Sequence, residues 1–424
     1  MIKIMRLNLS RVSAKIRNII VEIGEMADRQ DIAAYAVGGY VRDLILRREN
    51  LDLDIVVEGD AVAFAKLVSK AHKTLFQAYP QFKTATLVYA QGWRVDFATA
   101  RREEYPFSGA LPVVSEGSIL PDLFRRDFTI NAIAMKINVK DFGTWVDPYG
   151  GLTDIKRKTI RILHSKSFVD DPTRILRAVR FEQRFGFSLE RNTLILLKQA
   201  IHQGIVNNVK APRYFAEFRR ILKEQKVAAC LQRLKEFHGL DFLGEGIHLP
   251  AAFLRQIERA KEKWQRPVFY KDIRWDLLYL MSLVGKMNSP EVERFIARFQ
   301  LTKLEGESLQ QSLHTPEILR RLLRKNLQPS DVYQILIPCD DQVIGLMRVS
   351  SESRLIQGRI DNFVQKSRMT ALHITGNDLR EMGIKEGKTI GKVLQEVLLK
   401  KINGRIKNRR EELNAAREFL KEQN

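Results

Sequence analysis

Two aspartates, Asp52 and Asp54, alternate with apolar residues in the segment LDLDIVV, residues 51–57. Such a β-branched segment predicts a strand, and alternate side chains of a strand project from the same face, about 6–7 Å apart. Neighbouring carboxylates raise one another's pKa, and a divalent cation between them removes this repulsion. Because Mg²⁺ prefers oxygen ligands, the pair predicts a magnesium site with Asp52 and Asp54 as the metal ligands.

A third carboxylate, Asp96, lies on a later predicted strand and could supply a further oxygen ligand and catalytic group. Two metal ions about 3.5–4 Å apart can activate an attacking hydroxyl and stabilise the leaving oxygen in a phosphoryl displacement. Alternating aspartates can also mark the solvent face of an edge strand. The choice between these interpretations depends on the neighbouring segments.

A glycine pair, Gly38 and Gly39, precedes the aspartates in the segment VGGYVRD, residues 37–43. Glycine permits positive φ and lets a ligand approach backbone N–H groups, and the N-terminus of the helix that follows favours anions. Arg42 near the start of that helix could reach a triphosphate. A glycine turn, an arginine and a pair of aspartates in this order indicate a site for a nucleoside triphosphate.

Further motifs follow in order along the chain. The segments are GGYVRD with LDLDIVVEG (38–43 and 51–59), RRDFTINA (125–132), DPYGGLTD (147–154) and DDPTRILRAVRF (170–181). Together they resemble the class II tRNA nucleotidyltransferase and bacterial poly(A) polymerase family, within the polymerase-β-like superfamily. One departure is Asp170, where the family usually has Glu. A looser similarity covers residues 375–391.

The resemblance implies roles for individual residues. Asp52 and Asp54 would bind the catalytic Mg²⁺ ions, and Asp171 with Arg174 would read the Watson–Crick edge of the incoming base. The residues expected to bind the nucleotide are Gly38, Gly39, Arg42, Arg126, Asp171, Arg174, Arg177 and Arg180.

The spacing of the last four of these residues supports the same role. They recur every three positions, which on a helix produces one slanted polar ridge. A carboxylate acceptor and a forked guanidinium donor together can bond the edges of both C and A, so a protein can select bases without a nucleic-acid template. An ordinary amphipathic helix with ion pairs is the alternative.

The chain is predicted to be α+β, with a polymerase-β-like nucleotidyltransferase head, a small β-sheet with helices, followed by an all-α neck, body and tail. The predicted divisions are a catalytic head (1–153), a nucleotide-selecting neck (154–225), a body (226–330) and a tRNA-binding tail (331–424). Predicted strands are Ala33–Val37, Leu53–Val57, Thr84–Tyr89 and Trp93–Thr99, with a turn at Gln91-Gly92. Predicted helices are Leu7–Met26, Val41–Arg48, Asp60–Ala71, Pro172–Phe185, Asn192–Gln203, Ala211–Gln225 and Val227–Phe237.

The segment Arg101–Phe124 contains Pro106, Gly109, Pro112 and Gly117, which predict a mobile loop instead of a regular element. In the family that the motifs resemble, a flexible loop here is associated with addition of A, and enzymes that add only CC tend to lack it. The segment therefore favours A-adding or full CCA-adding activity.

The composition points to a polyanionic partner. The 424 residues include 71 Lys and Arg against 50 Asp and Glu, a formal charge of +21, which favours nucleic acid over an anionic membrane surface. Two distant cysteines, Cys230 and Cys339, predict neither a disulfide framework nor a zinc site and fit a reducing cytoplasm. We expect neither a membrane span nor a signal peptide, and no obligate protein partner is evident.

The predicted function is transfer of AMP, and also of CMP, from ATP and CTP to the tRNA 3′ hydroxyl with release of pyrophosphate. The basic helical part would hold the acceptor and TψC arms through shape and phosphate contacts. Three alternatives stay open: a specialist that adds only A, a poly(A) polymerase, and a non-catalytic RNA-binding protein on a degenerate scaffold. The intact Asp52 and Asp54 speak against the last.

Overall fold

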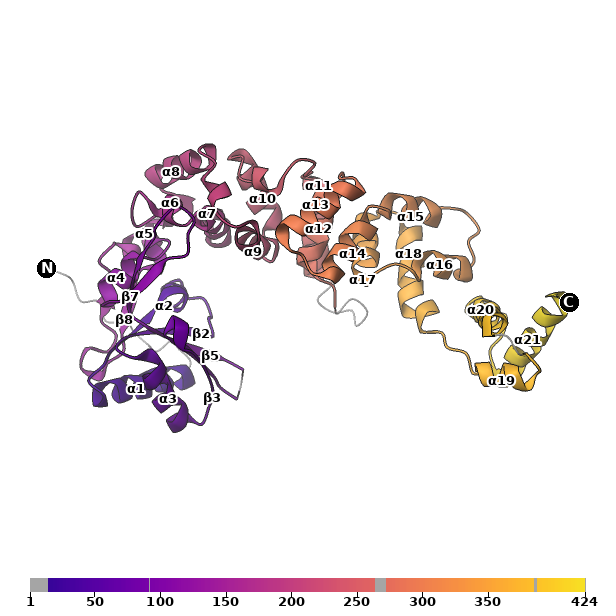
Figure 1. Ribbon diagram of the computed structural model, residues 1–424, viewed down its shortest axis with the longest axis horizontal. Helices are drawn as coiled ribbons and strands as arrows, with labels where there is room; N and C mark the ends of the chain where they lie inside the picture. The colour runs from indigo at the N-terminus through magenta and orange to yellow at the C-terminus, as the bar shows by residue number, and fades with distance from the viewer. Residues whose placement is uncertain (1–13, 91, 264–271, 385–386, 424) are drawn as a thin grey trace. The chain divides into compact units, whose positions relative to one another are not determined.

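The computed structural model describes residues 14–90, 92–263, 272–384 and 387–423. The chain forms two compact units, Met1–Phe242 and Leu243–Asn424. The first unit holds the β-sheet and its covering helices, and the described part of the second unit is built from helices (Figure 1). This arrangement confirms the predicted fold class. The finer division into head, neck, body and tail stays a prediction.

A seven-stranded sheet forms the centre of the first unit, in the order β3-β4-β5-β2-β1-β8-β9. β2 and β5 run parallel, and the other neighbouring strands pair antiparallel. The strands are β1 (Ala33–Val37), β2 (Asp52–Glu58), β3 (Leu75–Tyr79), β4 (Thr84–Val88), β5 (Arg94–Thr99), β8 (Ala134–Lys136) and β9 (Trp145–Val146). The four predicted strands are thus confirmed to within a residue at each end. Gln91 of the predicted turn lies outside the described residues.

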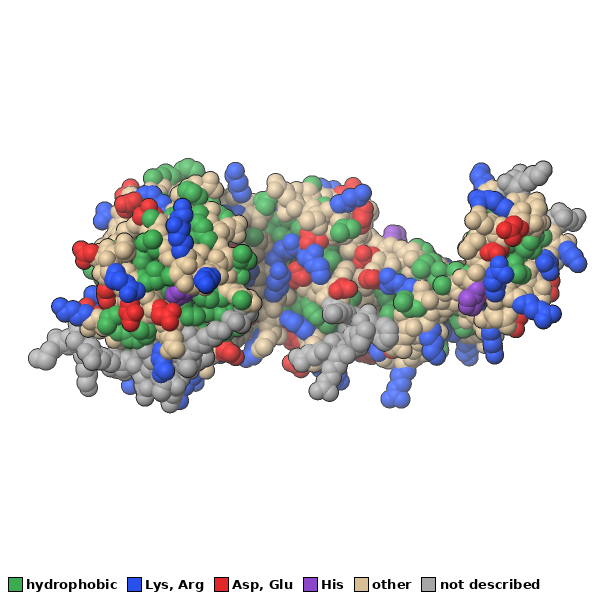
Figure 2. Space-filling model, turned by 90° about the horizontal axis from the view of Figure 1, so that it is seen from below, with side chains coloured by type: hydrophobic (Ala, Val, Ile, Leu, Met, Phe, Trp, Pro, Cys, Tyr) green, Lys and Arg blue, Asp and Glu red, His purple; other side chains and the backbone are tan. Residues whose placement is uncertain are grey.

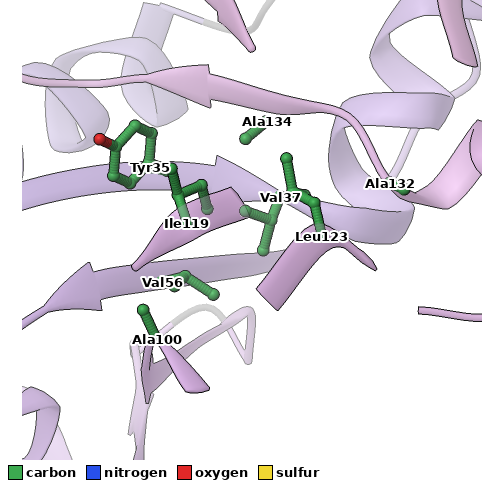
Figure 3. Packing of buried hydrophobic residues seen from close by; sticks show 8 residues of the cluster. All are labelled: Tyr35, Val37, Val56, Ala100, Ile119, Leu123, Ala132 and Ala134. Atoms are coloured by element: carbon green, nitrogen blue, oxygen red, sulfur yellow. The ribbon is translucent and has the colours of Figure 1, made fainter. Parts of the chain in front are cut away.

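Different helices cover the two faces of this sheet. On one face, Phe64 of α3 (Ala61–His72) packs edge-on against Phe97 of β5 with ring centroids 5.9 Å apart. On the other face, Ile119 and Leu123 of α4 (Ile119–Phe124) pack against Val37 and Val56 (Figure 3). Since Asp52 and Asp54 share the strand face of Val56, the short helix α4 lies on the same side of the sheet as the carboxylates.

Local chemistry explains where two of the head helices begin. The Asp60 carboxylate accepts from the backbone N–H groups of Val62 and Ala63, and this N-cap starts α3 one residue after the predicted start. α2 (Gly38–Ile45) begins three residues earlier than predicted, and its first residue, Gly38, turns the chain directly after β1 with a φ of 67°. α1 covers Ala14–Arg29, and the first half of the predicted Leu7–Met26 helix falls mainly outside the described residues.

The prediction of an irregular loop over Arg101–Phe124 is wrong. β6 (Arg101–Glu104) pairs with β7 (Val113–Glu116), and α4 follows directly. Pro106, Gly109 and Pro112 all fall in the connection between the two strands, which leaves two four-residue segments without a proline to pair. The irregular residues are mainly those of the connection between β6 and β7, whereas the prediction extended this irregularity over all of Arg101–Phe124.

Helices make up most of the rest of the first unit, together with the short pair β10 (Thr159–Ile160) and β11 (Ser188–Leu189). The helices are α5 (Gly151–Arg157), α6 (Ser167–Asp170), α7 (Thr173–Phe185), α8 (Arg191–His202), α9 (Ala211–Leu222) and α10 (Val227–Glu236). They confirm the four predicted helices of this region to within three residues. Asp171, however, lies between α6 and α7 with φ −134°, not on a helix, because the residue before a proline is pushed out of the helical region.

The described residues of the second unit form eleven α-helices. They are α11 (Ala251–Lys263), α12 (Trp275–Val284), α13 (Ser289–Phe299), α14 (Lys303–Ser312), α15 (Thr315–Leu322), α16 (Pro329–Leu336), α17 (Asp341–Ser350), α18 (Arg354–Gln365), α19 (Gly376–Glu381), α20 (Gly387–Ile402) and α21 (Arg409–Gln423). Many Lys and Arg side chains project from the C-terminal helices on the face drawn in Figure 2. Within the described residues, no helix has the length and apolar character required to cross a bilayer.

Candidate active site

A cavity of about 380 Å³ opens in the first unit where the end of β1, the start of β2 and the first turns of α7 come together. It brings together eight of the predicted site residues: Gly38, Gly39, Arg42, Asp54, Arg126, Asp171, Arg174 and Arg177. Three predicted residues, Asp52, Asp96 and Arg180, are not part of its lining. Residues that sequence reasoning did not assign to the site also line it, namely Glu103, Tyr105, Arg125, Asp127, Asn131 and Phe181. We refer to this cavity as the nucleotide pocket.

The acidic wall of the nucleotide pocket comes from β2. Leu53 is buried on the opposite face of the strand, so Asp52 and Asp54 point to the same side, as the alternation predicted. Asp54 stands in register with Asp96 of the parallel strand β5. Burial, together with the neighbouring Asp96 and Asp52, raises the pKa of Asp54 to about 6 against the opposing effect of Arg126. The carboxylates therefore form an acidic cluster that a cation would stabilise.

Asp96 has partners of its own within the sheet. Its carboxylate accepts a hydrogen bond from the Thr86 hydroxyl on β4 at 2.5 Å, and the Arg94 guanidinium lies 3.7 Å away. These contacts fix the Asp96 side chain on the carboxylate face of the sheet.

Gly38 lets two charged side chains approach the turn after β1. A Cβ atom at this position would lie 2.8 Å from Arg126 Nη1 and 3.4 Å from Asp54 Oδ2. The N-cap residue of α2, Val37, makes no side-chain capping bond, so the leading N–H groups of the helix face this corner without a side-chain acceptor. Such N–H groups, next to Arg126, are suited to bind a phosphate.

We expect Gly38→Ala to destabilise the protein by about 1–2 kcal/mol and to lower kcat/KM for the nucleotide by at least about tenfold. The reason is twofold: the positive φ strains a residue with a Cβ, and the Cβ displaces Arg126. Thermal unfolding and steady-state kinetics measure the two effects. Gly186→Ala is the matched control, since Gly186 has a φ of 65° and no described atom lies within 4 Å of its Cβ position. Equal kinetic losses in both variants would contradict the role of the Arg126 contact.

Two neighbouring arginines are oriented by one buried carboxylate. Asp122 accepts from Arg125 Nη2 at 2.7 Å and from Arg126 Nη2 at 2.9 Å. Burial alone would raise the pKa of Asp122, but Arg126 and Arg125 lower it below its usual value. The Nε atom of Arg126 is buried and has no hydrogen-bond partner among the described residues. Asp122 thus holds Arg126 in place beside the turn at Gly38.

Asp127 ties the head to α7. Its carboxylate accepts from Asn131 Nδ2 and from Arg177 Nε, each at 2.9 Å. Asn131 in turn accepts from Arg42 Nη1 at 2.7 Å, and Arg42 is paired with Asp43 at 2.8 Å. Arg42 and Arg177 therefore line the nucleotide pocket but use most of their donors to hold its walls together.

Asp171, just before α7, and Arg174, in the first turn of α7, both line the pocket. Asp171 Oδ1 accepts from the Thr173 hydroxyl at 2.7 Å and from Arg213 Nη2 at 3.1 Å. Arg174 donates to the Ser167 hydroxyl at 2.6 Å and to the backbone carbonyl of Arg125 at 2.7 Å. Sequence reasoning missed Arg213 because it lies on α9, outside the motifs.

Arg180 lies one turn beyond the pocket. Its guanidinium is 3.4 Å from Glu224 and stacks over the Phe181 ring at 4.6 Å. It contacts the residues that surround the site and not the cavity itself.

Two family models match successive segments of the chain. Residues 34–161 match the poly A polymerase head domain, and residues 186–248 match a domain described as the probable RNA and SrmB-binding site of polymerase A. The head therefore has the fold and the motifs of poly(A) polymerase-type nucleotidyltransferases, which use a divalent metal ion.

The chain is similar over most of its length to A-adding and CCA-adding tRNA nucleotidyltransferases. The chain is 33% identical over 413 residues to an A-adding tRNA nucleotidyltransferase of Geobacter sulfurreducens, covering 93% of this chain and 46% of that protein. It is 30% identical over 405 residues to the A-adding enzyme of Halalkalibacterium halodurans, covering 95% and 92%. A solved structure of a CCA-adding enzyme in an apo form superposes with a TM-score of 0.80 at 34% identity, covering 96% of each chain. A Thermotoga maritima CCA-adding enzyme complexed with tRNA superposes with a TM-score of 0.76 at 32% identity, covering 99% of this chain and 100% of that one.

The chain belongs to the tRNA nucleotidyltransferase family. It spans about half the length of the Geobacter sulfurreducens and Aquifex aeolicus relatives, 46% and 44% respectively.

Proposed function

We propose that this chain adds nucleotides to the 3′ end of tRNA, transferring AMP from ATP, and CMP from CTP, to the terminal 3′ hydroxyl with release of pyrophosphate. The observation that carries the proposal is one cavity lined by Asp54, the N-terminus of α2 and the Asp171–Arg174 pair. Relatives named A-adding enzymes, and similar solved structures described as complexes with ATP or CTP, support it. A cytoplasmic location, predicted from the cysteine usage, belongs to the same proposal.

The carboxylates fit Mg²⁺ that binds together with the triphosphate, and we propose the two-metal transfer that the motifs predict. Among the described residues, no three His, Cys, Asp or Glu side chains are grouped so that they could hold a metal on their own. Mg²⁺ commonly binds through one or two carboxylates and completes its shell with water and substrate phosphates, and Asp52 and Asp54 supply that number. When bound, the metal would neutralise the triphosphate and favour ionisation of the attacking hydroxyl.

The remaining groups of the pocket bind and orient the nucleotide. The N–H groups of α2 and the Arg126 guanidinium would hold the phosphates at the acidic wall. Asp171 and Arg174 would select the base, since an acceptor next to a forked donor can bond the edges of both A and C. This arrangement needs no nucleic-acid template.

An incorporation assay with three tRNA substrates tests the proposal. Purified protein is incubated with tRNA lacking the 3′ CCA, ending in C or ending in CC, with labelled ATP or CTP. Addition of A to tRNA ending in CC, followed by a stop, supports the proposed function, and additional C incorporation on the shorter substrates identifies full CCA addition. A long ladder of A would identify a poly(A) polymerase, and RNA binding without any incorporation would identify the non-catalytic alternative.

The raised pKa of Asp54 predicts acid inhibition of metal binding. A protonated carboxyl does not ligate Mg²⁺, and the pKa of this group is raised by burial to about 6. At limiting Mg²⁺, kcat/KM should therefore fall by about tenfold per pH unit once the pH drops below that value. Saturating Mg²⁺ should move the midpoint to lower pH, because the metal competes with the proton. A profile that does not respond to the Mg²⁺ concentration would rule out this assignment.

A further inference from the structure

A second, larger cavity adjoins the nucleotide pocket. Its volume is about 720 Å³, and all of its lining residues belong to the first unit. The two cavities share four lining residues, Glu103, Tyr105, Arg125 and Arg174. A molecule bound in the second cavity would therefore lie directly against the nucleotide pocket.

Aromatic rings form one wall of the second cavity. The Phe124 ring centroid lies 5.6 Å from that of Tyr149 and 5.1 Å from that of His164. Phe124 is 44% exposed, so its ring is accessible from the second cavity that it lines. An exposed ring flanked by two others provides a surface on which a planar group can stack.

The position of this ring is fixed by its neighbours. Ile119 and Leu123, on the same helix as Phe124, are buried against the sheet (Figure 3). The Tyr149 hydroxyl donates to the backbone carbonyl of Leu120 at 3.2 Å and so ties the second ring to α4. The stacking surface is therefore preformed.

The charged groups of the second cavity favour an anion. Glu103 is neutralised by Arg125 at 3.0 Å and by Arg101 at 2.8 Å. Asp170 lies 3.9 Å from His164, but burial lowers the pKa of this imidazole, so Asp170 stays as one carboxylate against the free cations of the cavity. Arg102 and Lys166 also line the cavity, and neither forms an ion pair within the described part of the chain. Two available cations beside an aromatic wall match a phosphate next to a base.

We propose that the second cavity binds one of the last two bases of the acceptor RNA, stacked on Phe124, with an adjacent phosphate held by Arg102 and Lys166. This inference rests on the proposed function, since transfer requires the RNA end to lie against the nucleotide pocket. Single-stranded RNA ends are commonly held by stacking on aromatic side chains, and the contribution does not depend on the identity of the base. The second cavity thus orients the attacking end of the RNA and leaves choice of the incoming base to Asp171 and Arg174.

Phe124→Ala tests the proposal because it should weaken binding of the RNA without weakening binding of the nucleotide. The KM and the equilibrium Kd for tRNA should rise by about tenfold, and the KM for ATP should change less than about twofold. Phe124→Leu, which keeps apolar volume without the ring, should show most of the same loss, and Phe124→Trp should restore binding. Phe82→Ala is the matched control, because Phe82 is also an exposed phenylalanine of the first unit, 59% accessible, and does not line either cavity.

RNAs with an abasic residue at the last or at the next-to-last position identify the stacked base. The abasic substitution at one of these positions should weaken binding to the wild type by about the same factor, and Phe124→Ala should then have no further effect. If the variant weakens both abasic RNAs as much as normal RNA, or raises the KM for ATP alone, the proposal is overturned. The Kd measurements remain decisive if the protein incorporates no nucleotide, so a failure of the proposed function is distinguished from a failure of this site.

Discussion

Asp54→Asn should lower AMP incorporation into tRNA by at least about a thousandfold without lowering the thermal midpoint of unfolding. The carboxylate is the part of the proposed metal site that lines the nucleotide pocket, so its loss removes stabilisation of the charge that develops on the phosphates. Burial raises the pKa of Asp54 to about 6, which means that the ionised group costs the fold stability at neutral pH. A neutral, isosteric amide removes this cost, and the midpoint measured in EDTA should stay the same or rise.

Three further observations separate loss of the metal from loss of structure. Mg²⁺ with ATP should raise the midpoint of the wild type but not of the variant, because only a bound ligand stabilises the native state. Binding of tRNA should be nearly unchanged. Asp241→Asn, which alters an exposed carboxylate of the same unit, 74% accessible, is the control and should retain full activity. Retention of more than about a tenth of the activity in Asp54→Asn would contradict the assigned role of this carboxylate.

Arg177→Met should destabilise the first unit by about 3–5 kcal/mol. Asp127 is buried, and the change removes the guanidinium that neutralises its carboxylate. Methionine fills much of the space of the arginine side chain. Urea-induced unfolding measures the loss. Arg220→Met is the matched control, because the Arg220–Glu217 pair has a 59% exposed arginine side chain and should cost less than about 1 kcal/mol.

The Asp127–Arg177 pair should make the stability of the first unit fall at acidic pH. Burial alone would raise the pKa of Asp127, but Arg177 and Asn131 lower it to about 2, below the value of an unfolded aspartate. The stability that the pair contributes is therefore complete above the unfolded pKa and is lost as the pH falls toward about 2. Arg177→Met should lose this acid sensitivity, and Asp127→Asn in the same chain should recover part of the stability. A variant that keeps the wild-type acid dependence would show that Asp127 is not the responsible group.

The sequence alone predicts those parts of the fold that depend on neighbouring residues. The alternation through Leu53 places Asp52 and Asp54 on one face, and the Asp60 cap fixes the start of α3, since both follow from local geometry. The motifs predict eight residues that line the nucleotide pocket. Gly38 and Arg126 lie in two separate motifs, and it was the resemblance of these motifs to the family that placed both residues in one site.

Features that depend on distant partners were not predictable from the sequence. Arg213 reaches Asp171 from α9, and Asp122 orients Arg126 from a helix inside the segment expected to be irregular. β6 and β7 pair across a connection whose prolines and glycine led to the prediction of a loop for the whole segment. Asp171 leaves the helical ridge because of Pro172, a signal that is present in the sequence and was outweighed by the regular spacing of the arginines.

The most direct test of the account is an anomalous diffraction measurement on crystals soaked with Mn²⁺ and a non-hydrolysable ATP analogue. We expect an anomalous peak coordinated by the Asp52 and Asp54 carboxylates, with the triphosphate at the N-terminus of α2 and the base facing Asp171 and Arg174. A nucleotide bound elsewhere, or a metal peak that neither carboxylate contacts, would contradict it.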